Sequence, residues 1–448
     1  MSTAKCDGND SIKNLPRIIS SLADLVEEGA EDNISKEETF VSITKSKSND
    51  NSNSDHNTIQ RRKNQKRLVL HFDINETILI GDDAGGDTVE ECLNKIIAKV
   101  AFVQLPKRND KSVETKDIVP ICWWDGTPII AEGEQRCEMI PPLYTGWEWP
   151  KDTCPYYRTA YKKRAKYFTM PTEHGEIYRP LYDHLKERIL NYTLKFSKSR
   201  QSETYHESSH PFNRMIPSFF HTLVKLKEEG RDYTLVLRTF GSDLEDIALA
   251  LSDFANGKHP LFPNFREPKL VLTANNLFKG RWRENNMSEK SATDEHLSVS
   301  NRTSSVFDLL PWNSHSTKAI ASGDDEVLHI IERSSVIGVQ DDYNHWDEND
   351  NAPWAGKPVW IHNDAIPTLQ HHIFFDDNIH NDTNDSIVAV RAVMNGMNWL
   401  SLTGSQTIDQ QGKYLFRVPT VEALLNNLWF YEKILNAESN VTDEIIIL

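Results

Sequence analysis

The chain has 448 residues, of which 26% are charged and 38% hydrophobic, which is typical of a globular protein with two or three domains or one large domain with insertions. Its formal net charge of −16 argues against nucleic-acid binding, which needs a basic surface, and is compatible with a site for divalent cations. The start of the chain lacks a signal peptide, no apolar run reaches membrane-spanning length, and the five cysteines include no CxxC pair. We therefore expect a cytoplasmic protein without a disulfide framework, a structural zinc site or a membrane partner.

Residues 1–66 predict a mostly disordered polar tail. Residues 46–57 are almost entirely Ser, Asn, Asp, Lys and His, and such a segment cannot bury enough apolar surface to offset the loss of chain entropy. The basic cluster at residues 61–67 loosely matches a nuclear-import pattern. A solvated basic flank before the first strand is the more ordinary interpretation.

The first predicted strand ends in a group of polar residues. The apolar residues 68–70 lead into His71-Phe-Asp73-Ile-Asn75-Glu-Thr77, so the carboxylate of Asp73 is expected at the end of a buried strand. Open α/β sheets bind their ligands at the carboxyl ends of the strands. Because Asp, Asn and Thr are also common in turns, this segment alone leaves an ordinary strand-to-turn transition open.

The middle of the chain predicts an inserted region. Helical spacing of apolar residues predicts a helix over residues 89–103, and residues 104–204, with many aromatic residues and prolines, predict a cap of short strands and loops. Aromatic clusters favour core packing, with a substrate-stacking wall as the alternative. His206 and His210 are four residues apart, but their loop-like surroundings disfavour a metal site.

Strands and helices alternate in the remainder of the chain. Helices are predicted over residues 217–229, 244–254 and 421–435, and strands over residues 233–237, 269–273, 335–340, 372–376 and 387–390. A polar insertion occupies about residues 284–305. This alternation predicts an α/β fold with a mostly parallel, three-layer, Rossmann-like sheet, formed by residues 67–103 and 205–448.

Three segments in this order resemble the haloacid dehalogenase superfamily of phosphatases and phosphotransferases. They are Asp73-Ile-Asn75-Glu-Thr77, then Arg238-Thr-Phe-Gly241, then a pair of aspartates after a later apolar strand. The resemblance covers the core segments from residue 68 to roughly residue 400 and does not extend to the insertions. It implies a Rossmann-like core with an inserted cap.

The resemblance also implies roles for individual residues. Asp73 would be the nucleophile that attacks phosphorus and forms an aspartyl-phosphate. Mg²⁺ would be bound by Asp73, the backbone carbonyl of Asn75 and the pair Asp376 and Asp377, because Mg²⁺ prefers hard oxygen ligands. Thr239 would donate a hydrogen bond to the phosphoryl group, and Lys357 would neutralise charge beside it.

A second acidic pair keeps part of this assignment open. Asp341 and Asp342 also follow an apolar strand, but the strand before Asp376 is more strongly apolar and another strand follows it quickly. The choice of lysine depends on the choice of pair, because Lys318 stands before Asp341 as Lys357 stands before Asp376. A solvated surface lysine is the alternative for either.

Asn75 departs from the family pattern, in which many phosphatases carry an aspartate that acts as general acid and base. An amide cannot exchange a proton, so a contribution on the order of 10²- to 10⁴-fold is absent at this position. Asp243 is a nearby carboxylate, although the sequence does not show that it reaches the site.

The predicted function is therefore a Mg²⁺-dependent phosphatase acting through Asp73 on a small phosphorylated substrate or a phosphoprotein. The alternatives are a catalytically weak or inactive protein with a binding or regulatory role, suggested by Asn75, and a hydrolase of carbon–halogen bonds. There is no Walker-type loop, no Gly-x-Ser-x-Gly motif and no His-Glu-x-x-His motif. The identity of the substrate and the oligomeric state stay open.

Overall fold

The computed structural model describes most of the chain after the tail. It covers residues 66–81, 86–105, 118–129, 140–199, 211–284, 305–313, 318–362, 370–379, 386–394, 398–402 and 405–445. The predictions for the tail, for the basic cluster up to residue 65 and for His206 and His210 lie outside these residues. The chain divides into two compact units, one of residues 1–42 and 97–181 and the other of residues 43–96 and 182–448.

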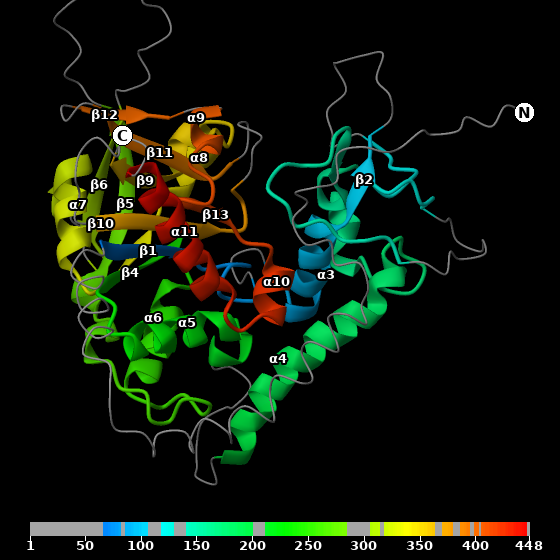
Figure 1. Ribbon diagram of the computed structural model, residues 1–448, viewed down its shortest axis with the longest axis horizontal. Helices are drawn as coiled ribbons and strands as arrows, with labels where there is room; N and C mark the ends of the chain where they lie inside the picture. Colours follow the sequence, from blue (N-terminus) through cyan, green and yellow to red (C-terminus); the bar gives the residue numbers. More distant parts are fainter. Residues whose placement is uncertain are drawn as a thin grey trace, which may run out of the picture. The chain divides into compact units, whose positions relative to one another are not determined.

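The larger unit contains an eight-stranded sheet with the strand order β13-β10-β1-β4-β8-β5-β6-β7 (Figure 1). Its strands are β1 (Arg67–Asp73), β4 (Tyr233–Thr239), β5 (Leu277–Glu284), β6 (Ser305–Pro311), β7 (Ala321–Ser322), β8 (Val336–Gln340), β10 (Gln370–Asp376) and β13 (Leu415–Arg417). Neighbouring strands from β13 to β5 are parallel, whereas β6 and β7 pair antiparallel at the edge. The predicted α/β class with a mostly parallel sheet is confirmed.

Three helices pack on one face of this sheet: α5 (Pro217–Glu228), α6 (Leu244–Ala255) and α11 (Trp429–Ile445). Phe72 of β1 contacts Phe219 of α5 and Phe430 of α11 edge to face, with ring centroids 5.3 and 5.1 Å apart. In Figure 1, α5 and α6 lie below the strands. Because successive residues of a strand point to opposite faces, the side chains next to Phe72, those of His71 and Asp73, point to the other face.

That other face is covered by helix α7 (Asp324–Arg333) and a three-stranded sheet, which Figure 1 shows above the large sheet. The small sheet has the order β12-β11-β9 and consists of β9 (Lys357–His362), β11 (Val388–Met394) and β12 (Asn398–Ser401). Val69 and Val236 of the large sheet form one buried hydrophobic cluster with Val327 of α7 and Trp360 of β9. The small sheet therefore lies on the face toward which Asp73 points.

The other elements are shorter or belong to the smaller unit and its boundaries. The helices are α3 (Val89–Val100), α4 (Arg179–Ser199), α8 (Tyr343–Glu348), α9 (Ser405–Ile408) and α10 (Thr420–Leu425), and the strands are β2 (Phe102–Gln104) and β3 (Thr153–Pro155). The 3₁₀ helices are η2 (Tyr156–Arg158), η3 (Lys162–Tyr167), η4 (Glu176–Tyr178), η5 (Pro211–Arg214), η6 (Pro268–Leu270), η7 (Ala274–Asn276) and η9 (Pro353–Ala355).

The aromatic residues of the smaller unit pack against one another. Tyr156, Phe168 and Tyr178 are almost completely buried, and Trp123 contacts all three rings at centroid distances of 5.6 to 6.2 Å. These contacts account for the aromatic cluster as core packing. The region predicted as a cap, residues 104–204, also contains the long helix α4, which the prediction of short strands and loops omitted and most of which belongs to the larger unit.

Three further predicted elements are wrong in type or extent. The strand expected over residues 269–273 is not formed. Its first two residues belong to the 3₁₀ helix η6, which begins at Pro268, the other three have no regular secondary structure, and the next strand, β5, starts only at Leu277. The helix expected over residues 89–103 ends at Val100 and is followed by strand β2. The closing helix is two helices, because the Asn426 side chain accepts a hydrogen bond from the Leu428 backbone N–H and a new helix begins at Trp429.

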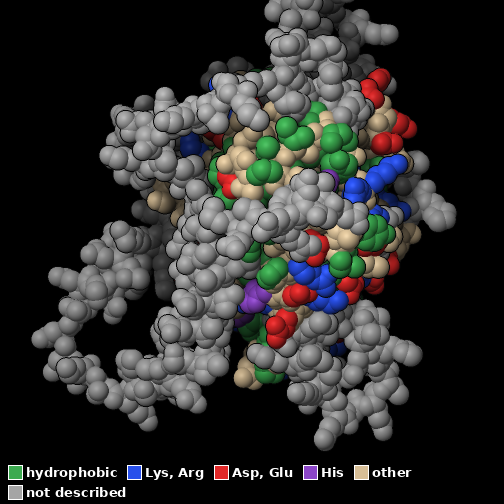
Figure 2. All heavy atoms as spheres, turned by 90° about the vertical axis from the view of Figure 1, so that its right-hand side faces the viewer, with side chains coloured by type: hydrophobic (Ala, Val, Ile, Leu, Met, Phe, Trp, Pro, Cys, Tyr) green, Lys and Arg blue, Asp and Glu red, His purple; other side chains and the backbone are tan. Residues whose placement is uncertain are grey.

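No helix among the described residues is both long and apolar enough to cross a membrane. The described cysteines Cys92, Cys122 and Cys154 are free thiols. On the face drawn in Figure 2, acidic and basic side chains of the described residues lie next to one another, and no wide basic area is visible there.

Candidate active site

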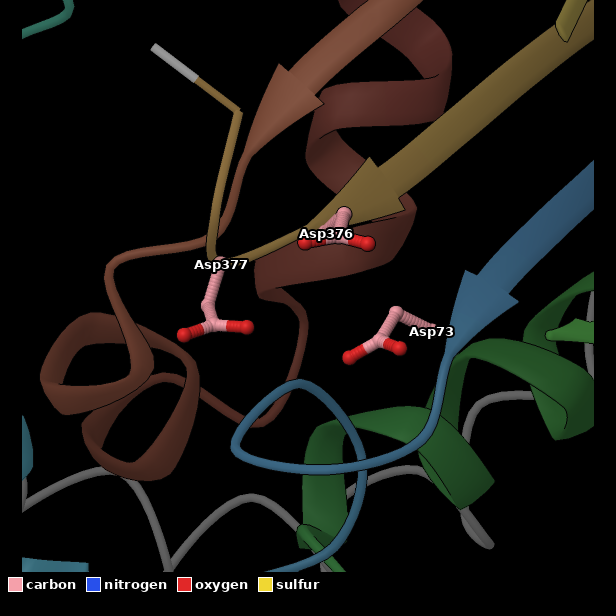
Figure 3. Close-up of side chains that lie close together, drawn as sticks. All are labelled: Asp73, Asp376 and Asp377. Carbon is pink, nitrogen blue, oxygen red and sulfur yellow. The ribbon is translucent and has the colours of Figure 1, made fainter. Parts of the chain in front are cut away.

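The carboxylates of Asp73, Asp376 and Asp377 converge at the carboxyl ends of two neighbouring strands. Asp73 is the last residue of β1, Asp376 is the last residue of β10, and these strands are parallel neighbours. One oxygen from each of the three carboxylates lies within 4.8 Å of the others, and all three residues are buried. In Figure 3 the three side chains face a common space at the ends of the two strands.

Lys357 places an ammonium group between two of these carboxylates. Its Nζ donates a hydrogen bond to Asp376 Oδ2 at 2.8 Å and another to Asp73 Oδ1. Lys357 is the first residue of β9, so it reaches the carboxylates of the large sheet from the small sheet. Only 1% of the residue is exposed.

The charges of this cluster do not balance. Burial raises the pKa of Asp73 well above its usual range, and the nearby Asp376 and Asp377 carboxylates raise it further, while Lys357 opposes the shift. Burial disfavours the charged form of Lys357, but Asp376, Asp73 and Asp341 raise the pKa of its ammonium group above the ordinary value. With all four groups ionised, one ammonium group lies among three carboxylates, so these four side chains together carry a net charge of −2.

A tight loop after Asp73 joins the two acidic strand ends. The Ile74 carbonyl accepts hydrogen bonds from the backbone N–H groups of Thr77, Ile78 and Leu79 at 3.3, 3.0 and 2.9 Å. This turn brings the Thr77 hydroxyl to the second strand, where it accepts a hydrogen bond of 3.1 Å from the Asp377 backbone N–H. Thr77 therefore fixes the position of Asp377 relative to the loop that begins at Asp73.

Thr239, Asn75 and Asp243 form a second polar group beside the first. Strand β4 pairs with β1 so that Asp73 stands next to Arg238, and Thr239 follows it as the last residue of the strand. Asn75 Nδ2 donates a hydrogen bond of 3.1 Å to Asp243 Oδ2. A methyl group placed on Gly241 would lie 2.6 Å from that Asp243 oxygen, 3.2 Å from Asn75 Nδ2 and 3.3 Å from the Thr239 hydroxyl, so a residue without a side chain is needed there.

The rival acidic pair has different partners. Asp341 accepts hydrogen bonds from Nε and Nη2 of Arg238, the first at 2.9 Å, and each of the two side chains is only 1% exposed. Asp342 accepts from the Trp282 backbone N–H at 2.9 Å and caps α8 through His345 N–H. Lys318 is exposed. Asp376, Asp377 and Lys357 thus lie next to Asp73. Asp341 and Asp342 instead accept hydrogen bonds from Arg238 and from backbone N–H groups.

Two residues of the site were not singled out from the sequence. Asn378 donates its backbone N–H to Asp376 Oδ1 at 2.8 Å and its side-chain amide to Asp377 Oδ1 at 3.0 Å, so it orients both carboxylates. The Phe240 ring lies 5.2 Å from Lys357 Nζ and stacks on Trp346 at 5.3 Å. Asn378 could have been suspected from its place directly after the acidic pair, whereas nothing in the sequence connects Phe240 with Lys357.

Comparisons with known proteins add no assignment. No family model matches the chain, and searches of curated proteins and of solved structures gave no significant match. The arguments below therefore depend on the geometry of the site.

Proposed function

We propose that the protein is a Mg²⁺-dependent phosphatase of the haloacid dehalogenase type that hydrolyses a phosphomonoester through an aspartyl-phosphate on Asp73. The observation that supports it most is the convergence of Asp73, Asp376 and Asp377 with Lys357 at the carboxyl ends of parallel strands. Ligand sites of open α/β sheets occur at this edge. The substrate would be a small phosphorylated compound or a phosphoprotein.

The residues of the site divide the reaction into two displacements. In the first, an oxygen of Asp73 attacks phosphorus and the bond from phosphorus to the leaving oxygen breaks. In the second, a water oxygen attacks phosphorus, the bond to Asp73 breaks, and inorganic phosphate leaves. Lys357 donates hydrogen bonds beside the nucleophile, and the Thr239 hydroxyl is the neutral donor for the phosphoryl oxygens.

The donor set of this cluster suits Mg²⁺. It consists of carboxylate oxygens within 4.8 Å of one another, and a divalent cation would relieve the repulsion among them. Among the described residues, none donates a hydrogen bond to the backbone carbonyl oxygen of Asn75, so this oxygen would be available as a further hard ligand. Bound Mg²⁺ would neutralise charge on the phosphoryl oxygens and orient the phosphoryl group.

Proton transfer needs a group other than Asn75, and we infer that Asp243 supplies it. Asp243 is 5% exposed and stands at the start of α6 without capping the helix through its side chain, which is directed to Asn75 instead. Because Asn75 donates through Nδ2, its amide oxygen is left as an acceptor, and this oxygen is buried without a partner among the described residues. In this role a protonated Asp243 would donate its proton to the leaving alkoxide oxygen in the first displacement. The resulting carboxylate would take a proton from the attacking water in the second, with the Asn75 amide oxygen as a further acceptor for that water.

The direct experiment is hydrolysis of p-nitrophenyl phosphate by the full chain with and without Mg²⁺. We expect turnover that EDTA abolishes and that Asp73→Asn eliminates. Asp325→Asn is the matched control, because the same change on the exposed surface of α7 leaves the carboxylate cluster intact. Turnover by Asp73→Asn equal to that of wild type would contradict the proposal.

A binding or regulatory protein without turnover is the second candidate, and the amide at position 75 is the observation that favours it. It predicts no hydrolysis across a broad panel of phosphomonoesters while Mg²⁺ still binds. A carbon–halogen hydrolase would release halide without a metal requirement. The convergence of Asp376 and Asp377 on Asp73 argues against that reaction, because a reaction without a metal ion does not need three crowded carboxylates.

A further inference from the structure

Lys357 enters the site from a separate sheet, and the backbone around it is fixed by three different elements. The Gly356 carbonyl accepts a hydrogen bond of 2.9 Å from the indole Nε1 of Trp282. The Lys357 backbone N–H donates to the Ile387 carbonyl at 2.8 Å. The Pro358 carbonyl accepts from Nη1 of Arg238 at 3.0 Å. Three consecutive residues are thus each anchored.

Two of these anchors come from side chains of the large sheet. Trp282 lies in β5 and Arg238 in β4, whereas Lys357 lies in β9 of the small sheet. Trp282 is 5% exposed, and Arg238 and Lys357 are each 1% exposed, so water does not compete for these hydrogen bonds. Both anchors connect the sheet that carries Lys357 to the sheet that carries Asp73.

The fit around Gly356 leaves little room for adjustment. A methyl group placed on Gly356 would lie 2.1 Å from the Ile387 carbonyl oxygen. The backbone before Lys357 therefore packs directly against the segment that leads into β11. A shift of this backbone would move the whole lysine stem, and its ammonium group must reach Asp73 and Asp376 together.

We propose that Trp282 and Arg238 are positioning residues for Lys357, holding its strand so that the ammonium group bridges the nucleophile and Asp376. This inference rests on the proposed function only in assigning a catalytic consequence to the position of Lys357. The physical reason is entropic as well as geometric. A lysine side chain has several rotatable bonds, and a fixed backbone removes one source of motion at the point where charge must be placed accurately.

Trp282→Phe tests the inference, because it removes the indole N–H and keeps an aromatic ring in the buried site. Trp360→Phe is the matched control: its indole N–H donates at 2.8 Å to Asp324, it is equally inaccessible, and it lies in the same strand as Lys357. We expect kcat for p-nitrophenyl phosphate to fall about 10- to 100-fold in Trp282→Phe, with KM changed less than about twofold. Trp360→Phe should keep the kcat of wild type, although both variants lose thermal stability.

A double-mutant cycle separates positioning from general weakening of the fold. In a Lys357→Met background, Trp282→Phe should lower kcat by less than about twofold, because the group that it positions is already absent. Equal fold-losses of kcat in the two backgrounds would overturn the inference, and so would equal losses for Trp282→Phe and Trp360→Phe.

A crystal structure of Trp282→Phe gives a readout that does not depend on activity. We expect Lys357 Nζ to lose its hydrogen bond to Asp73 or to Asp376. Retention of both hydrogen bonds would overturn the inference even if the protein hydrolyses no phosphomonoester. Turnover that survives Asp73→Asn would instead contradict the proposed function and leave this structural test to decide the inference.

Discussion

Replacing Asp73 by asparagine should stabilise the protein in the absence of metal, although it removes a partner of a buried lysine. The reason is the crowding of three carboxylates around one ammonium group. Asp73 is repelled by Asp376 and Asp377 and attracted by Lys357. After the substitution Lys357 keeps its hydrogen bond to Asp376, so no buried charge is left without a partner.

The magnitude follows from these distances. At 4.8 Å, the upper limit for the separations in the cluster, two carboxylates repel each other by about 3.5 kcal/mol at an effective dielectric constant of about 20. Two such repulsions total about 7 kcal/mol, and they slightly exceed an attraction of about 6 kcal/mol to the ammonium group at ordinary hydrogen-bond distance. Burial of the charge adds to the repulsive side, so we expect a gain of about 1 to 3 kcal/mol.

The dependence on pH has a definite sign. Burial raises the pKa of Asp73 in the folded state, so the folded protein retains this proton at pH values where the unfolded chain has lost it. This carboxyl group therefore makes the wild type less stable as the pH rises. The Asp73→Asn variant lacks the effect, and its advantage should grow as the pH rises above about 3.9, the ordinary pKa of an aspartate carboxyl group.

Urea unfolding in EDTA, followed by tryptophan fluorescence, measures the difference. With Mg²⁺ at about 100 times its Kd for wild type, this advantage should shrink by about 2.7 kcal/mol, because a ligand at that concentration stabilises the protein that binds it by that amount. A loss of more than about 1 kcal/mol by Asp73→Asn in EDTA would show that the Lys357 ion pair outweighs the repulsion. The reasoning about charge at this site would then be refuted.

Three other substitutions test separate parts of the structure. Arg238→Met leaves the buried Asp341 charge without its partner and should lower the free energy of unfolding in urea by about 3 to 5 kcal/mol. The double variant Arg238→Met, Asp341→Leu should regain most of this loss. A loss below about 1 kcal/mol in Arg238→Met would contradict a structural role for the pair. Burial lowers the pKa of His371 to about 4, so between pH 7 and pH 5 this side chain takes up a proton in the unfolded chain but not in the folded protein. Over this range the free energy of unfolding of wild type should therefore fall by about 2 kcal/mol more than that of His371→Gln. Equal losses for the two proteins would be the contrary result. Asp243→Asn should slow hydrolysis of an alkyl phosphate by about 10²- to 10⁴-fold. It should slow hydrolysis of p-nitrophenyl phosphate far less, because nitrophenolate leaves without a proton. Equal slowing of both substrates would show that Asp243 does not transfer the proton.

The convergence of the acidic residues could be foreseen because it follows from sheet geometry. Asp73 and Asp376 each end an apolar run, and parallel strands present their carboxyl ends at one edge. Strands β5 (Leu277–Glu284) and β6 (Ser305–Pro311) flank the predicted polar insertion, whose interior lies outside the described residues. Local composition was sufficient to place each strand end, although the pairing of β1 with β10 is itself a long-range contact.

The choice between the two acidic pairs depended on tertiary contacts. Asp341 and Asp376 follow similar strands, and only the fold shows that Arg238 occupies the first while Lys357 contacts the second. Spacing suggested Lys357, but no local pattern could show that it arrives from a second sheet. Trp282 is 74 residues away in the sequence from Gly356, whose carbonyl accepts a hydrogen bond from its indole. Sequence periodicity describes only neighbouring residues and therefore cannot predict this contact.

The most direct measurement is chemical trapping of the intermediate. The full chain is mixed with Mg²⁺ and a phosphomonoester that it hydrolyses, and the reaction is quenched in acid. Reduction with borohydride then converts an aspartyl-phosphate into homoserine. The account predicts homoserine in place of Asp73 in the peptide that contains β1, detected by mass spectrometry and absent without substrate. Hydrolysis at full rate, with Asp73 unmodified and homoserine found in place of another aspartate, would contradict the account.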